Sequence, residues 1–123
     1  MDSCPKPKAH EIGAEAEQLA RVYLHSQGYR ILHSNYACKG GEIDCIAMDG
    51  SVLCFVEVRA RATDAHGHPL ETIGAQKQRR IIRAAGSFME AWTGAWPELR
   101  FDALGILLGR EPEYVLVKEA FEA

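Results

Sequence analysis

Apolar residues recur at helical spacing in two segments of the chain. In residues 11–27 the apolar positions lie three and four residues apart, and Gly28 supplies a C-terminal stop. Residues 74–92 repeat this spacing with a longer apolar stripe, formed by Ile81, Ile82, Ala85, Phe88, Met89 and Trp92. The pattern therefore predicts two amphipathic helices, one over each segment.

Strand-like segments lie between these helices and after the second one. Residues 29–36 predict a first strand, and the Asp49-Gly50 dipeptide, a strong hairpin signal, predicts a second and a third strand on its two sides. Residues 100–108 and 113–117 predict two closing strands. This order of elements indicates an α/β fold with a central mixed β-sheet flanked by α-helices.

The predicted hairpin collects charged side chains on one face of the sheet. A two-residue turn at Asp49-Gly50 sets Met48 opposite Ser51, Cys45 opposite Cys54, Asp44 opposite Phe55, and Glu42 opposite Glu57. Side chains alternate along a strand, so one face carries Glu42, Asp44, Phe55, Glu57 and Arg59. The other face is apolar and predicts the core, with Ile43, Cys45, Ala47, Cys54, Val56 and Val58.

Three carboxylates on one strand face suggest a bound cation. Like charges directly across a strand pair destabilise it, more so when they are partly desolvated. Carboxylate oxygens with positions left for water and phosphate suit Mg²⁺ or Mn²⁺ better than zinc. The alternative is an ordinary solvated sheet face on which Arg59 bridges the acids. Both interpretations stay open at this point.

A second group of charges lies on the predicted second helix. Lys77, Arg79, Arg80 and Arg83 fall within two helical turns, in a chain of net charge −3. Such a concentrated positive patch is what neutralisation of nucleic-acid phosphates requires. A solvated helix face is the alternative. On the first helix, Glu17 flanks the apolar stripe, from where its carboxylate could reach over the edge of a sheet or stay in solvent.

Length and composition fit one globular domain. The chain has 123 residues, of which 47% are hydrophobic and 25% charged. We expect a flexible N-terminal tail over residues 1–10, a single domain over 11–123, and a loop over 62–72. No apolar run resembles a membrane span or a signal peptide, so we expect a cytoplasmic protein. The four cysteines lack zinc-ligand spacing and are expected to be reduced thiols.

Several ordered motifs resemble those of a known family. They run from Gly13-Ala-Glu-Ala-Glu17 through Gly28-Tyr29-Arg30, Asn35, Gly41-Glu42-Ile43-Asp44, Phe55-Val56-Glu57-Val58-Arg59, Lys77 and Arg100-Phe101-Asp102. In this order they resemble the YraN family of small bacterial proteins. The resemblance implies a restriction-endonuclease-like fold, related to archaeal Holliday junction resolvases, and a predicted endonuclease activity.

The resemblance also implies roles for individual residues. Asp44 and Glu57 would hold a divalent metal, Mg²⁺ or Mn²⁺, with the Val58 carbonyl as a third ligand and Glu17 in support. Glu42 belongs to the motif without a settled role. Arg59 stands where the pattern has lysine, and an arginine stabilises phosphate charge but cannot act as a base. Lys77 is not expected to replace that lysine, because a residue on a helix would have to reach the hairpin face.

Two functions follow from these observations. The first is a metal-dependent DNA endonuclease, acting on branched or otherwise structured DNA. It is favoured by the complete set of Glu17, Asp44 and Glu57. The second is a catalytically weak or inactive nuclease-fold module that binds nucleic acid or a protein partner. It is favoured by Arg59 and by the acidic overall charge. By analogy with resolvases, a homodimer would be expected of the endonuclease.

Overall fold

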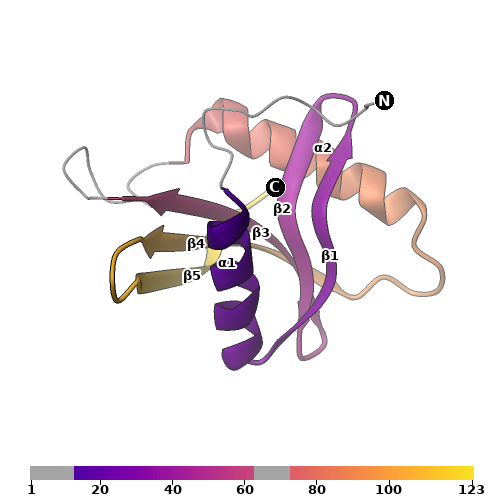
Figure 1. Ribbon diagram of the computed structural model, residues 1–123. Coiled ribbons are helices and arrows are strands. Elements are labelled where there is room, and N and C mark those ends of the chain that lie inside the picture. The colour runs from indigo at the N-terminus through magenta and orange to yellow at the C-terminus, as the bar shows by residue number, and fades with distance from the viewer. Residues whose placement is uncertain (1–12, 63–72) are drawn as a thin grey trace.

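The computed structural model describes residues 13–62 and 73–123. Its elements follow the predicted order: α1 (Ala14–Ser26), β1 (Tyr29–Cys38), β2 (Gly41–Asp49), β3 (Val52–Arg61), α2 (Ala75–Glu90), β4 (Glu98–Leu107) and β5 (Glu113–Phe121). Both predicted helices and all five predicted strands are therefore present (Figure 1). The expected tail over residues 1–10 and nearly all of the expected loop over 62–72 lie outside the described residues.

The five strands form one mixed sheet in the order β1-β2-β3-β4-β5. Strands β3 and β4 are parallel, and the other three neighbouring pairs are antiparallel. The connection between the two parallel strands contains α2, as parallel neighbours require. The predicted class, an α/β fold with a mixed sheet flanked by helices, is confirmed. None of the helices in the described part of the chain is long and apolar enough to cross a membrane.

The hairpin between β2 and β3 has a different register from the predicted one. Asp49 pairs with Val52, so the turn is formed by Gly50 and Ser51 and not by Asp49 and Gly50. Gly50 takes the positive φ of 63° that the turn needs. Asp49 stays in the strand, where its carboxylate accepts a hydrogen bond from Arg100 at 2.7 Å. That bond gives a physical reason for the difference.

The new register moves β3 by two residues along β2. A shift of two leaves each side chain on its own face, so the expected grouping of charges on β3 survives. It separates Cys45 from Cys54, because Cys45 now pairs with Val56 and Cys54 with Ala47. The predicted cross-strand cysteine pair is therefore wrong. Among the described residues, Cys38, Cys45 and Cys54 form no disulfide with one another.

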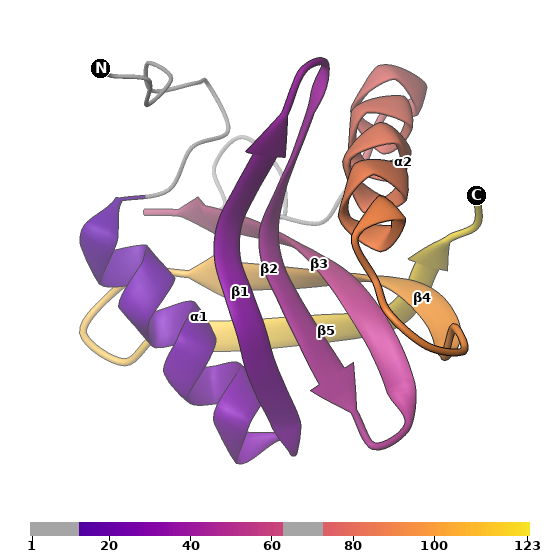
Figure 2. The same cartoon turned by 90° about the vertical axis from the view of Figure 1, so that its right-hand side faces the viewer.

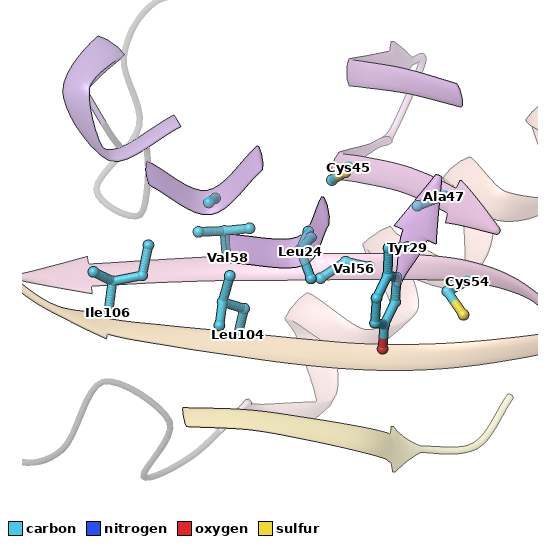
Figure 3. Close-up of a cluster of buried hydrophobic side chains, with 10 residues drawn as sticks. Leu24, Tyr29, Cys45, Ala47, Cys54, Val56, Val58, Leu104 and Ile106 are labelled. Atoms are coloured by element: carbon cyan, nitrogen blue, oxygen red, sulfur yellow. The ribbon is translucent and has the colours of Figure 1, made fainter. Parts of the chain in front are cut away.

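Both faces of the sheet carry a hydrophobic core, although the sequence predicted one. Residues of β3 alternate between the two: Cys54, Val56 and Val58 pack with α1 (Figure 3), and Leu53 and Phe55 pack with α2. The sequence placed the core on the apolar face of the hairpin alone. This prediction is wrong, because α2 also covers the charged face. Figure 2 shows α2 beside the hairpin of β1 and β2, and α1 next to β1 at the other end.

One residue of the predicted apolar face lies on the opposite side. Ile43 was expected beside Cys45, but it joins the cluster under α2 together with Ile46. The strict alternation of β2 therefore fails between these positions. The irregularity lies at Asp44, which is itself one of the candidate site residues.

Glycine allows α2 to approach the sheet closely. A Cβ atom on Gly41 would collide with the backbone carbonyl oxygen of Arg80, and it would lie 3.0 Å from the backbone nitrogen of Ala84. The backbone of β2 and the backbone of α2 are thus in direct contact at this point. Glu42 follows Gly41, so the contact sets the distance between Glu42 and the side chains of α2.

Candidate active site

Asp44 is fixed against β3 by its own side chain. The regular pairing of β2 with β3 ends at Cys45 and Val56. Beyond it, the backbone N–H of Val58 donates a hydrogen bond of 2.8 Å to Asp44 Oδ2. A carboxylate therefore binds a backbone donor of the neighbouring strand, which orients it toward Glu57, the residue before Val58.

Glu57 is the buried carboxylate of the site. Its side chain is 1% exposed, and among the described residues neither of its oxygens has a hydrogen-bond partner. Burial and the neighbouring Asp44 carboxylate raise the pKa of Glu57 well above its usual range, although Lys77 and Arg59 counteract this. Glu57 is held where an isolated negative charge is unfavourable.

Two cations approach Glu57 from different elements. Lys77 Nζ, on α2, lies 3.8 Å from Glu57 Oε1 and 3.6 Å from Glu42 Oε2. Arg59 Nε, on β3, lies 3.9 Å from Glu57 Oε2. The expectation that Lys77 would not reach the hairpin face is wrong. The close approach of α2 at Gly41, which the sequence pattern did not show, brings its ammonium group there.

Glu42 connects β2 to the helix. Besides its contact with Lys77, it accepts a hydrogen bond of 3.2 Å from Arg80. The Glu42 side chain is partly buried, and Lys77 is only 13% exposed. The interpretation of these charges as an ordinary solvated sheet face is therefore wrong.

Glu17 reaches the edge strand and not the centre of the cluster. Its Oε2 accepts a hydrogen bond of 2.7 Å from the side-chain amide of Asn35, on β1. Asn35 has a φ of 56°, a left-handed conformation that asparagine tolerates better than most residues. Its neighbours Ser34 and Tyr36 pair with Cys45 and Ile43, so Asn35 lies opposite Asp44. Glu17 is thus linked, through Asn35, to the strand beside Asp44.

The remaining basic candidates face outward from α2. Arg79 and Arg83 are exposed, and they line an open depression of about 600 Å³ with Gly40, Gln76, Arg80 and Ile82. Gly40, in the turn between β1 and β2, has a φ of 86°, and a Cβ added there would come within 2.8 Å of Arg83 Cδ. The structure therefore separates the predicted basic group in two. Lys77 faces the carboxylates, and Arg79 and Arg83 face solvent.

The residues fit a hard divalent cation only in part, as far as the described chain goes. Within residues 13–62 and 73–123, no group of three or more His, Cys, Asp and Glu side chains is arranged to hold a metal. Glu57 nevertheless supplies two buried oxygens without hydrogen bonds, beside the Asp44 carboxylate. Mg²⁺ commonly takes one or two carboxylates and completes its shell with water and phosphate oxygens. Asp44 and Glu57 would supply these two carboxylates, and water and phosphate would have to supply the other ligands.

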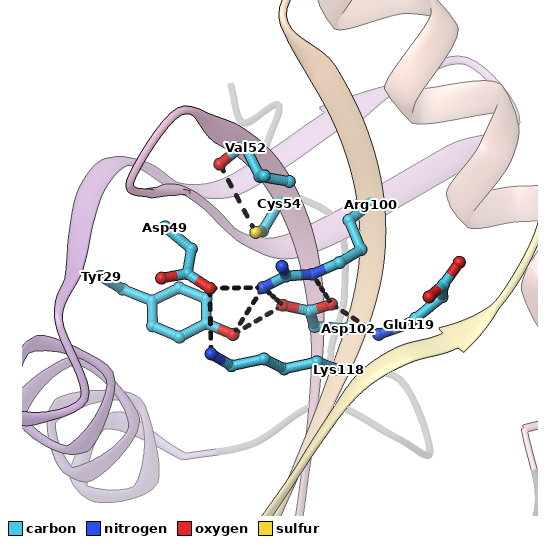
Figure 4. Close-up of polar contacts among 8 residues, drawn as sticks. All are labelled: Tyr29, Asp49, Val52, Cys54, Arg100, Asp102, Lys118 and Glu119. Atoms are coloured by element: carbon cyan, nitrogen blue, oxygen red, sulfur yellow. Dashed lines mark hydrogen bonds and ion pairs between the residues drawn. The ribbon is translucent and has the colours of Figure 1, made fainter.

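A second polar cluster was not predicted from the sequence. Asp102 accepts hydrogen bonds from Arg100 at 2.8 Å, from the Tyr29 hydroxyl at 2.6 Å and from the Glu119 backbone N–H at 2.9 Å (Figure 4). Burial alone would raise the pKa of Asp102, but these bonds lower it. Arg100 and Asp102 are two residues apart on a predicted strand, which is the signal that could have placed them on one face.

Fold and site together define a class of protein. The chain is an α/β protein whose mixed sheet and two flanking helices are compatible with a restriction-endonuclease-like fold, with a charged cluster where β2 and β3 separate. Residues 16–106 match the model described as "Uncharacterised protein family UPF0102". The chain belongs to this family, the YraN family, which confirms the resemblance.

Relatives from several bacteria agree with this membership. A UPF0102 protein of Chlorobaculum parvum is 44% identical over 117 residues, which cover 89% of this chain and 91% of the relative. A UPF0102 protein of Anaeromyxobacter is 40% identical over 111 residues, covering 89% and 84%. A third, from Chlorobium chlorochromatii, is 45% identical over 102 residues, covering 83% and 78%. These names state a family and no activity.

Proposed function

We propose that this protein is a DNA endonuclease that depends on Mg²⁺ or Mn²⁺. The observation that carries the proposal is Glu57, a buried carboxylate without hydrogen-bond partners in the described chain, next to the Asp44 carboxylate. A buried carboxylate that the protein leaves unsatisfied is costly, and such groups concentrate at sites that bind a ligand or an ion. A divalent cation is the ligand that removes this cost.

Asp44 and Glu57 would hold the ion. When bound, it would polarise the scissile phosphate and lower the pKa of a water molecule for in-line attack. The contact between Asp44 and the Val58 N–H positions one ligand before the ion arrives. The Val58 carbonyl as a further ligand and Glu17 as a support remain part of the proposal. Glu42 would orient the cationic side chains of α2.

The DNA backbone would lie across α2. Arg79 and Arg83 are exposed on the helix that also carries Lys77 and Arg80 toward the acidic cluster. A strand that follows this surface would have its phosphates neutralised by the outer arginines, with one phosphate close to Asp44 and Glu57. We extend the proposal to branched or structured DNA and to a homodimer, because a junction has two strands to cut.

The second candidate function is a nuclease-fold module that binds nucleic acid or protein with little or no catalysis. The observation that favours it is that two cationic side chains already lie beside Glu57. Lys77 and Arg59 already lie within 4 Å of Glu57, and the residue at the usual lysine position is an arginine. These cations partly offset the charge of Glu57 without any metal.

A cleavage assay separates the two functions. Purified protein is incubated with linear, single-stranded and four-way-junction DNA, with Mg²⁺, Mn²⁺ or EDTA. We expect cleavage that needs the metal and that falls by about 100-fold or more in Asp44→Asn, because a ligand is lost. The matched control is Glu90→Gln, which neutralises an exposed acid at the end of α2. It should cleave like the wild type. Absence of cleavage on every substrate would contradict the endonuclease.

Binding measurements test the outer arginines. We expect Arg79→Ala and Arg83→Ala each to weaken DNA binding and to reduce the slope of log K against log salt by about one. Arg110→Ala, which removes an exposed arginine outside α2, is the matched control. Unchanged salt dependence in both helix variants would show that DNA does not contact this surface. Binding that depends on Arg79 and Arg83 without any cleavage would support the binding module.

A further inference from the structure

We infer that Lys77 of α2, and not Arg59 of β3, is the cationic catalytic residue that contacts the reacting phosphate. The inference rests on the proposed endonuclease function and names a residue of the same site. It starts from position. Lys77 Nζ lies 3.6 Å from a Glu42 oxygen and 3.8 Å from a Glu57 oxygen, and Arg59 Nε lies 3.9 Å from the other Glu57 oxygen. Lys77 is thus placed between the two carboxylates.

The location of Lys77 on the helix supports a role in the site. Lys77 lies in the first turn of α2, which begins at Ala75 and has no acidic residue in that turn. The N-terminal end of a helix carries a partial positive charge, so a lysine there does not stabilise the helix. Its position is instead favourable toward the acidic groups of β2 and β3. The helix end and the ammonium group together create a positive field suited to an incoming phosphate.

Neighbouring contacts would let Lys77 change partners during binding. Glu42 also has Arg80, whose NH2 group lies 3.2 Å from Glu42, closer than the 3.6 Å to Lys77 Nζ. Glu42 therefore keeps a cation if Lys77 turns away. A lysine ammonium is compact and carried on a flexible four-carbon chain, so a small rotation moves it from carboxylate to phosphate oxygen.

Arg59 is less suited to this task. Its planar guanidinium is rigid, stays protonated and binds best to two oxygens at once, and it lies beside Glu57 with Nε 3.9 Å from Oε2. This geometry is consistent with a group that offsets the charge of Glu57. The lysine of the family pattern is then not missing from the chain. Its role has passed to a neighbouring element that the fold brings to the same carboxylate.

Exchange of the two cations tests the inference. Cleavage rates are measured for wild type, Lys77→Met, Arg59→Met and the double variant Lys77→Met with Arg59→Lys. We expect Lys77→Met to lower kcat by about 100-fold with little change in KM, and Arg59→Met to cost less than about 10-fold. The double variant, with lysine returned to β3, should recover at least about 10-fold over Lys77→Met. Lys118→Met, which removes a half-exposed lysine that pairs with Asp49, is the matched control.

A second readout separates catalysis from assembly of the site. Mn²⁺ binding, with metal alone, is measured by calorimetry for wild type, Lys77→Met and Lys77→Gln, each first shown to be folded by circular dichroism. We expect Mn²⁺ affinity to be equal or higher in the variants, because they lack a cation that competes for Glu57. A loss of Mn²⁺ binding in both variants would overturn the inference, since Lys77 would then only organise the carboxylates.

The outcomes distinguish the inference from the proposed function. If wild type cleaves and Lys77→Met cleaves equally well, the inference fails and the endonuclease stands. If Arg59→Met loses activity as much as Lys77→Met does, or the double variant gains nothing, the transfer of the role from β3 to α2 is wrong. If wild type neither cleaves DNA nor binds Mn²⁺, the proposed function fails and the inference fails with it.

Discussion

Two buried carboxylates in the sheet have opposite surroundings. Asp102 is 0% exposed and Glu57 is 1% exposed. Asp102 accepts hydrogen bonds from Arg100, from Tyr29 and from the Glu119 backbone, whereas neither Glu57 oxygen has a hydrogen-bond partner in the described chain. Hydrogen bonds overcome the effect of burial and lower the pKa of Asp102. At Glu57 burial prevails and the pKa is raised.

The difference shows how to separate structural charges from functional ones. A buried carboxylate with all its partners holds elements together, here β4 to β1 and β5 (Figure 4). A buried carboxylate without hydrogen bonds lowers stability, and such groups concentrate at functional sites. Burial alone would have ranked the two residues equally. The contacts place Asp102 in the hydrogen-bond network of the fold, and they make Glu57 the leading residue of the proposed site.

Removal of Asp102 should have the largest effect on stability. Asp102→Ala leaves the Arg100 guanidinium and the Tyr29 hydroxyl without their buried acceptor, so we expect a loss of about 3–5 kcal/mol in the free energy of unfolding. Urea unfolding followed by circular dichroism measures this. Tyr29→Phe, which removes one hydroxyl and keeps the ring, should cost about 1 kcal/mol. If Asp102→Ala lowers the free energy of unfolding by less than about 1 kcal/mol, Asp102 is not the structural carboxylate that its hydrogen bonds indicate.

Glu57→Gln should have a smaller effect with a characteristic pH dependence. Because the pKa of Glu57 is raised in the folded state, that state binds the proton more tightly than the unfolded chain does. Glu57 therefore favours folding most in acid, and its contribution falls as pH rises above its unfolded pKa of about 4.3. Relative to wild type, Glu57→Gln should gain about 1–3 kcal/mol between about pH 5 and about pH 8.

Urea unfolding at several pH values, in EDTA, tests this prediction. Asp102 serves as the comparison, because its pKa is shifted in the opposite direction. Its contribution to folding stability is present above its unfolded pKa of about 3.9 and is lost as pH falls through the folded pKa. Its contribution should therefore be constant where that of Glu57 declines. A stability difference between Glu57→Gln and wild type that does not grow with pH would show that folding does not raise the pKa of Glu57.

The smallest effect should come from the rim of the Asp102 cluster. Lys118 Nζ lies 3.0 Å from Asp49 Oδ2, but the lysine side chain is 49% exposed. Solvent screens such a pair, so we expect Lys118→Ala to change the free energy of unfolding by no more than about 0.5 kcal/mol. Thermal unfolding at low and high salt measures it. A cost comparable to that of Asp102→Ala would mean that the cluster is stabilised from its exposed side.

Much of the fold follows from sequence patterns. The helical spacing predicted α1 and α2 with bounds one to three residues too wide at each end, and the strands were found in the correct order. The hairpin signal at Asp49-Gly50 located the turn, but its register was wrong by two residues. The missing information was the long-range bond from Arg100 that holds Asp49 in β2. Local propensity contains no term for a partner 51 residues away.

The sequence by itself determined the element order, the class of fold and which charged residues of β3 share a face, because these depend on local spacing and alternation. Tertiary structure decided that this face is buried, that Asp102 is satisfied while Glu57 is not, and that Lys77 reaches Glu57. Each of these depends on contacts between distant segments, above all the approach of α2 to Gly41. Desolvation and hydrogen bonding arise only when such segments meet, and they set the chemistry of a carboxylate.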